Sequence, residues 1–175
     1  VLVNSSIRGQ VAWKRVAWGP WPSRIKILEP VLSDSMGRTV VSAKSITIDE
    51  LDLAGLLNNR LSARSIRIDT PVTKLISLPN PESSASQSDE RILNISEMFW
   101  PPGGRIDDGR PSQLDLDLTE IDIRNGMFVL DNPSTFIVAH GINIPNARFR
   151  LYETKTDDFM AIESKHLSIS QLQVK

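Results

Sequence analysis

Alternation of apolar and polar residues with a period of two is the sequence feature that most restricts how this chain can fold. It runs through the stretches 45–48, 65–68, 114–118, 121–123 and 167–170. Successive side chains of a β-strand point to opposite faces of a sheet, so this spacing is typical of strands with one face toward a core. We therefore predict an all-β fold with one or two short helices.

Two of these stretches repeat each other with an offset of 20 residues, at 42–49 and 62–69, and a weaker copy lies at 163–169. An offset of this length fits successive strands of a meander, where each unit extends one sheet. We predict an elongated antiparallel β-sheet curled into an open apolar groove. The alternative is a closed β-sandwich with a structural or adhesive role, in which the same apolar residues form a sealed core.

The apolar phase slips by one residue at two places, and a turn dipeptide follows the second. The slips predict β-bulges at Asp49-Glu50 and Thr119-Glu120, because without them the next apolar residues would face the wrong side. Asn125-Gly126 favours a tight turn, since both residues tolerate positive φ. We therefore interpret 114–130 as a hairpin.

The chain is interpreted as one domain in three parts. Residues 1–78 form an N-terminal β-meander with a short helix near 53–60, where leucines recur at helical spacing. Residues 79–113 form a flexible Pro- and Ser-rich linker with a short amphipathic segment. Residues 114–175 continue the sheet.

Several chemistries are excluded or disfavoured by composition. The chain has no cysteine, so disulfides, thiolate zinc sites and cysteine nucleophiles are excluded. There is no Gly-x-Ser-x-Gly pattern or phosphate-binding Gly-rich loop, and His140 and His166 are interpreted as structural. The acidic cluster at 107–122 is interpreted as a solvated surface rather than a metal site. We expect a non-enzymatic protein without cofactor or metal.

Three of the four tryptophans, Trp13, Trp18 and Trp21, lie among basic residues near the start of the chain. Such a stretch can pack at the core or edge of the sheet, lie near a membrane interface, or stack on single-stranded nucleic acid. The net charge of -1 gives no general attraction to nucleic acid. We therefore expect no nucleic-acid partner and keep these tryptophans as membrane-proximal candidates.

The apolar residues of the alternating stretches are the candidate contact surface. On a concave face they would shield acyl chains from water, or contact a client polypeptide; the set is Ile46, Ile48, Ile66, Ile68, Leu114, Leu116, Leu118, Ile121 and Ile123.

The order of these features resembles the N-terminal part of AsmA/TamB-like envelope proteins. The stretch 25–32 matches an early family element, and 46–53 with Leu56-Leu57 matches an alternating strand followed by a Leu-rich turn. The stretch 66–72, with its Pro71, matches a strand ending in proline. After a low-complexity loop, 121–131 looks like the next family element, two strand segments around Asn-Gly that end in Asp.

The resemblance implies an elongated periplasmic β-structure with an apolar groove and no catalytic residues. It implies movement of phospholipid between inner and outer membranes in Gram-negative envelope biogenesis. For the TamB branch, it implies assembly or secretion of outer-membrane β-proteins with a barrel partner. The expected partners are thus phospholipid acyl chains or a client β-protein. No run approaches the length of a membrane-spanning helix, so we expect an inner-membrane anchor outside this chain.

Overall fold

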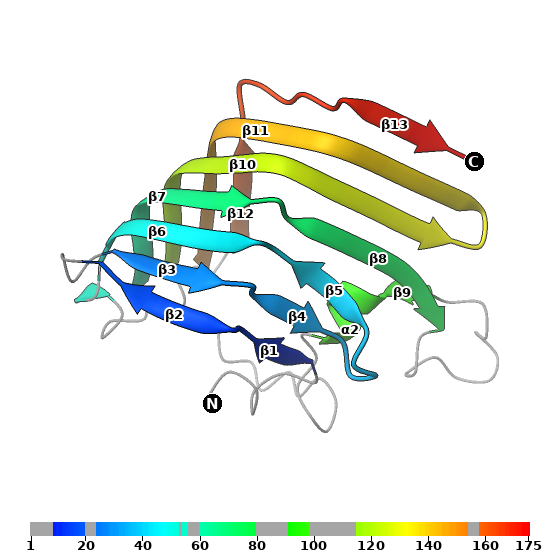
Figure 1. Cartoon of the computed structure of the whole chain (residues 1–175), viewed down its shortest axis with the longest axis horizontal. Helices are drawn as coiled ribbons and strands as arrows, with labels where there is room; N and C mark the ends of the chain where they lie inside the picture. Colours follow the sequence, from blue (N-terminus) through cyan, green and yellow to red (C-terminus); the bar gives the residue numbers. More distant parts are fainter. Residues whose placement is uncertain are drawn as a thin grey trace.

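A computed structural model describes residues 9–19, 24–52, 54–55, 60–79, 91–98, 115–153 and 158–175. This part is almost entirely β, built around one 13-stranded sheet that does not close on itself (Figure 1). The all-β curled sheet predicted from the sequence is confirmed. Within the described residues the sheet is single and open, so the alternative prediction of a closed β-sandwich is wrong.

Consecutive strands join end to end into long paths that cross the sheet side by side in chain order. The paths are β1 (Gln10–Ala12) with β2 (Arg15–Trp18); β3 (Ile25–Leu28) with β4 (Val31–Ser33); β5 (Thr39–Ser42) with β6 (Ser45–Leu51); β7 (Arg60–Asp69) with β8 (Val72–Pro79); β10 (Asp115–Asn132); β11 (Thr135–Glu153); and β12 (Asp158–Glu163) with β13 (Gln171–Val174).

Neighbouring paths are antiparallel with one exception. β10 runs parallel to both β7 and β8, with Ile121 opposite Ile66 and Phe128 opposite Thr73. A parallel pair needs a long crossover, and the chain supplies one between β8 and β10. The described part of this crossover contains β9 (Arg91–Leu93), which pairs with β8, and the helix α2 (Asn94–Met98). The expectation of a wholly antiparallel sheet is therefore corrected at this pair.

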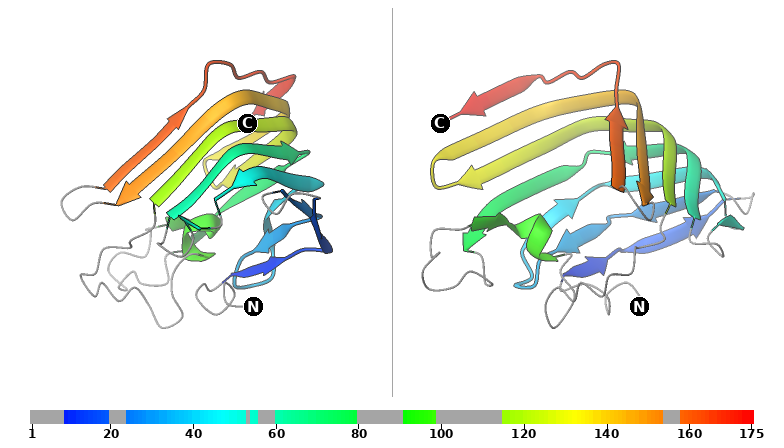
Figure 2. Two further views of the ribbon diagram at one scale, coloured as in Figure 1. Left: turned by 90° about the vertical axis from the view of Figure 1, so that its left-hand side faces the viewer. Right: turned by 180° about the vertical axis from the view of Figure 1, so that it is seen from behind.

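The sheet bends sharply near one end, as the right-hand view of Figure 2 shows for β6, β7, β10 and β11. Glu50, Glu120 and Asn146 lie along this bend with positive φ values of 54°, 51° and 52°. The β10–β11 register shifts between Leu118 and Ile121, which confirms the predicted bulge at Thr119-Glu120. At Glu50 the irregular backbone is present, but the register with β7 continues unshifted.

A second line of irregular residues crosses the middle of the sheet. It consists of Glu29, Thr70, Asn125 and Gly141, all with positive φ. The predicted hairpin turn at Asn125-Gly126 is wrong, because β10 continues through both residues and the chain reverses after Asn132. The conformational tolerance of Asn-Gly serves a bulge inside a strand here, since a left-handed residue bends the strand without ending it.

The α-helix that the described residues form, α2, lies in the crossover. Where an amphipathic segment was predicted in the linker, α2 forms, and the fully buried Asn94 attaches it to β8. Its side-chain oxygen accepts from the Ile76 amide at 3.0 Å, and its amide donates to the Lys74 carbonyl at 3.1 Å. The helix predicted near 53–60 lies largely outside the described residues, as does most of the linker 79–113.

Candidate functional site

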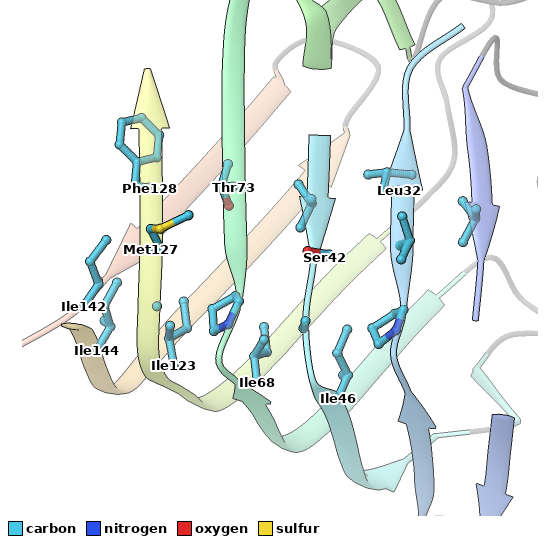
Figure 3. A pocket seen from close by; sticks show the side chains of 17 residues that line it. Leu32, Ser42, Ile46, Ile68, Thr73, Ile123, Met127, Phe128, Ile142 and Ile144 are labelled. Carbon is cyan, nitrogen blue, oxygen red and sulfur yellow. The ribbon is translucent and has the colours of Figure 1, made fainter. Parts of the chain in front are cut away.

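An apolar pocket of about 440 Å³ lies on the concave face of the sheet (Figure 3). Strands from both halves of the chain contribute to it, because the parallel β7–β10 pair brings the N-terminal meander beside the C-terminal one. The lining residues are Val11, Pro30, Val31, Leu32, Val41, Ser42, Ala43, Ile46, Ile68, Pro71, Thr73, Ile123, Gly126, Met127, Phe128, Ile142 and Ile144.

The floor of the pocket is built from rows of directly paired residues. We call the first the isoleucine row: Ile27, Ile46, Ile68, Ile123 and Ile144 are cross-strand partners on successive strands. Directly paired residues share one face of a sheet, so these side chains form a continuous apolar strip. In Figure 3, Ile46, Ile68, Ile123 and Ile144 come from four neighbouring strands.

Two further rows extend this strip along the strands. The tryptophan row contains Trp18, Ile25, Ile48, Ile66, Ile121 and Ala147. The edge-to-edge row contains Val11, Leu32, Val41, Thr73, Phe128, Ala139 and Leu172, and it reaches from β1 to β13. The apolar face is therefore continuous between the two edges of the open sheet.

The chemistry of the lining is almost purely apolar. Among the described residues that line the pocket, Ser42 and Thr73 contribute the only side-chain hydroxyls, and none carries a charge. Such a surface gives no directional recognition, so its ligand would be held by removal of apolar area from water. Burial of each methylene is worth about 0.8 kcal/mol. The pocket suits an uncharged hydrocarbon chain and offers no arrangement for acid–base or nucleophilic catalysis.

The sequence-predicted contact residues fall into three groups. Ile46, Ile68 and Ile123 line the pocket, whereas Ile48, Ile66 and Ile121 lie in the adjacent tryptophan row. Leu118 lies beyond the bend, where it pairs with Ala63. Leu114 and the side chain of Leu116 lie outside the described residues.

Residues of the edge-to-edge row were not among the sequence candidates, although Val11, Leu32, Val41 and Phe128 line the pocket. Val11, Leu32 and Val41 lie on strands of only three or four residues, so period-two alternation has little length in which to appear. Phe128 lies on the long strand β10, but beyond the irregular Asn125. A proline directly after an irregular residue could have been a signal, because Pro30 follows Glu29 and Pro71 follows Thr70 at the kinks that border the pocket.

The acidic residues of the predicted surface cluster have basic partners where the structure describes them. Arg148 Nη2 lies 3.1 Å from Asp117 Oδ1, and Arg124 Nη2 lies 3.2 Å from Asp122 Oδ2. At the bend, Arg64 lies between two carboxylates, and the charge of Glu50, followed by that of Glu120, raises its pKa. Among the described residues, no group of three or more acidic or histidine side chains could hold a metal ion.

Both edges of the sheet expose apolar side chains. On β2, Trp18 is 63% exposed, and Trp13 just before it is 49% exposed; Trp21 lies outside the described residues. At the opposite edge, Ile162, Leu172 and Val174 are exposed. The face that contains the pocket is thus apolar out to both of its edges.

Within the described residues, no helix has the length and apolar character needed to cross a bilayer. Comparisons of the chain with protein-family models, with curated protein sequences and with solved structures found no match.

Proposed function

We propose that this chain is a segment of a periplasmic AsmA/TamB-like envelope protein, anchored to the inner membrane by a segment outside this chain. In this proposal its groove shields phospholipid acyl chains during transfer between the inner and outer membranes. The observation that supports the proposal best is the uncharged pocket on an apolar face that continues from edge to edge of an open sheet.

The energetics favour a mobile acyl chain over a fixed ligand. A pocket of about 440 Å³ is within the usual range for small-molecule sites. A dozen buried methylenes would contribute on the order of 10 kcal/mol before the entropic cost of ordering the chain. Because these contacts are non-directional, the chain can slide along neighbouring rows without passing a high barrier. A conduit needs this combination of strong retention and easy movement.

The test is to identify lipid that co-purifies with the chain from bacterial envelopes, using native mass spectrometry and lipid extraction. We expect bound phospholipid in the wild type and its loss in Ile46→Asp, which places a carboxylate in the isoleucine row. Thr47→Asp is the matched control. Thr47 is the next residue on β6, points to the opposite face and pairs with Arg67, so it tolerates the same carboxylate.

Ile46→Trp keeps the test decisive if the aspartate variant does not fold. An indole at this position fills pocket volume while keeping the surface apolar, so bound phospholipid should fall in a folded protein. The proposal is wrong if a folded Ile46→Trp or Ile46→Asp protein retains as much phospholipid as the wild type. It is also wrong if the wild type contains none.

A second candidate function is a scaffold for assembly or secretion of outer-membrane β-proteins, in which an exposed strand edge pairs with a strand of the client and an outer-membrane barrel acts as partner. The observation that favours it is β13, whose four residues are all exposed and which pairs only with β11 among the described strands. An exposed edge is a template for an added strand. This function predicts crosslinking of unfolded barrel segments to β13, with undiminished yield in Ile46→Asp.

A further inference from the structure

The β1–β2 edge differs in charge from the rest of the chain. Residues 9–28 contain four basic residues, Lys14, Arg15, Arg24 and Lys26, and no acidic residue. The whole chain has 20 basic and 21 acidic residues, so subtracting these four leaves 16 against 21, a balance of -5. This stretch therefore has a net charge of +4, the sum of its four basic residues, whereas the remainder of the chain is acidic overall.

Part of this basic charge has no ion-pair partner among the residues that the structure describes. Lys14 Nζ lies 2.7 Å from Glu29 Oε1, and Arg24 forms an ion pair with Asp49. Arg15 and Lys26 are exposed and form no ion pair with any described residue. Arg15 is three residues from Trp18 on β2, and Lys26 is one residue from Ile25 on β3. Because both offsets are odd, the two basic residues lie on the face opposite the groove. Their charge is available to an anionic partner at this edge.

The exposed tryptophans lie at the same edge. Trp18 is the first member of the tryptophan row, so its indole continues the apolar face of Ile25, Ile48 and Ile66 out to the solvent. A largely exposed indole is costly in water but suits the headgroup region of a bilayer, where its ring meets acyl chains and its N–H meets polar groups. Basic residues beside it complement anionic headgroups.

We propose that the β1–β2 edge docks on the surface of an anionic phospholipid bilayer and so opens the groove directly onto the membrane. This inference rests on the proposed function, since it names the place where acyl chains would enter. Trp18 and Trp13 insert among the headgroups, and Arg15 and Lys26 contact anionic lipid. An acyl chain that leaves the bilayer at this edge then meets the tryptophan row first and the pocket next.

The test is co-sedimentation of the chain with vesicles of equal parts phosphatidylglycerol and phosphatidylcholine, and with vesicles of phosphatidylcholine alone. We expect binding to the anionic vesicles that weakens with added salt. Arg15→Gln and Lys26→Gln should each weaken it about fivefold, as expected for one basic residue near an anionic surface. Trp18→Ser should weaken binding to both kinds of vesicle.

Matched controls separate docking from a general effect of charge or exposed apolar area. Arg67→Gln removes an exposed basic residue from β7, in the middle of the sheet, and Leu172→Ser removes a side chain that is 58% exposed at the opposite edge. Both should bind vesicles like the wild type. Three results would each overturn the proposal. The controls could lose as much binding as the edge variants, the edge variants could bind like the wild type, or the wild type could fail to bind.

The outcomes also separate this inference from the groove itself. Ile46→Asp should lose co-purified phospholipid and keep vesicle binding, whereas Arg15→Gln with Lys26→Gln should lose vesicle binding and keep the capacity to take up detergent-dispersed phospholipid. A wild type that contains phospholipid but ignores anionic vesicles overturns the docking edge alone. Vesicle binding by a chain that never holds phospholipid contradicts the proposed function alone.

Discussion

Asp34 shows how a single side chain fixes the shape of the sheet beside the pocket. It is 1% exposed at the turn between β4 and β5. Its carboxylate accepts from the amides of Met36 at 3.0 Å and Arg38 at 2.8 Å, and from the Arg38 guanidinium at 2.7 Å. A buried carboxylate is tolerated only when its acceptor capacity is used, and here it holds the turn that positions Leu32 and Val41.

We predict that Asp34→Ala lowers the free energy of unfolding by about 2–3 kcal/mol, because it removes charge-assisted hydrogen bonds from a buried turn. Chemical denaturation followed by circular dichroism measures the change. Asp131→Ala, at an exposed strand position, is the control and should change stability by less than about 0.5 kcal/mol. A loss at Asp34 no larger than at Asp131 would show that the turn does not depend on this carboxylate.

At the residue scale, the sequence identifies three of the five members of the isoleucine row and misses the edge-to-edge row. Ile46, Ile68 and Ile123 stand in alternating stretches long enough to reveal a period. Phe128 does not, because the irregular Asn125 separates it from the stretch 121–123. Val41 does not, because its strand of four residues is too short to show a period. Buried polar residues such as Asp34 and Asn94 cannot be recognised from the sequence, since their burial depends on partners that only the folded chain supplies.

At the scale of the elements, left-handed residues convert a set of straight strands into a curved surface. Glu50, Glu120 and Asn146 lie on different strands but on one line, so the strands bend together. The spacing of three residues between Ile48 and Leu51, and between Leu118 and Ile121, is absorbed by these kinks. The β-bulge predicted from the apolar phase at Thr119-Glu120 is confirmed, whereas at Asp49-Glu50 the backbone kinks without the register shift that a bulge would cause. The sequence could not show whether Asn125-Gly126 forms a kink within one strand or a turn between two strands, because either conformation needs a residue with positive φ.

Substitution of Gly141 tests directly how β13, in the last path of the sheet, is attached to β11. It has a φ of 62°, and a Cβ there would lie 2.8 Å from the Ser170 Cβ. We predict that Gly141→Ala destabilises the protein by about 2–4 kcal/mol, through backbone strain and overpacking. The loss should concentrate in β13, so hydrogen exchange of the amides of Gln171–Val174 should speed up more than exchange in β7.

Ser170→Gly in the same chain removes the clashing side chain and leaves only the backbone strain. The double variant should therefore recover at least 1 kcal/mol relative to Gly141→Ala, a coupling typical of residues in contact. Additive effects of the two substitutions would show that Ser170 does not constrain Gly141. Unchanged exchange in β13 would show that this path is attached independently of the bulge.

At the scale of the whole molecule, the decisive feature is that one face of the sheet is apolar and that no second sheet of the described residues packs against it. The parallel pairing of β10 with β7 and β8 joins two meanders into one surface, and no period in the sequence could predict it, because pairing across the 80–114 crossover depends on tertiary contacts. Among the residues that the structure describes, the buried apolar side chains are few: Val40, Ala63, Ile66, Ala139 and Ala147. Much of the apolar area that would stabilise a closed fold is instead available to a ligand.

This openness predicts that phospholipid stabilises the chain. A ligand that binds only the folded state adds RT ln(1 + [L]/Kd), about 2.7 kcal/mol at a hundredfold excess over Kd. The delipidated chain should therefore unfold at a lower temperature, and detergent-dispersed phospholipid should raise its Tm in a dose-dependent way. Differential scanning calorimetry measures the shift. Ile46→Trp should abolish it and Thr47→Asp should keep it, because only the first substitution fills the pocket. A shift of equal size in Ile46→Trp would mean that lipid stabilises the chain from a surface other than the groove.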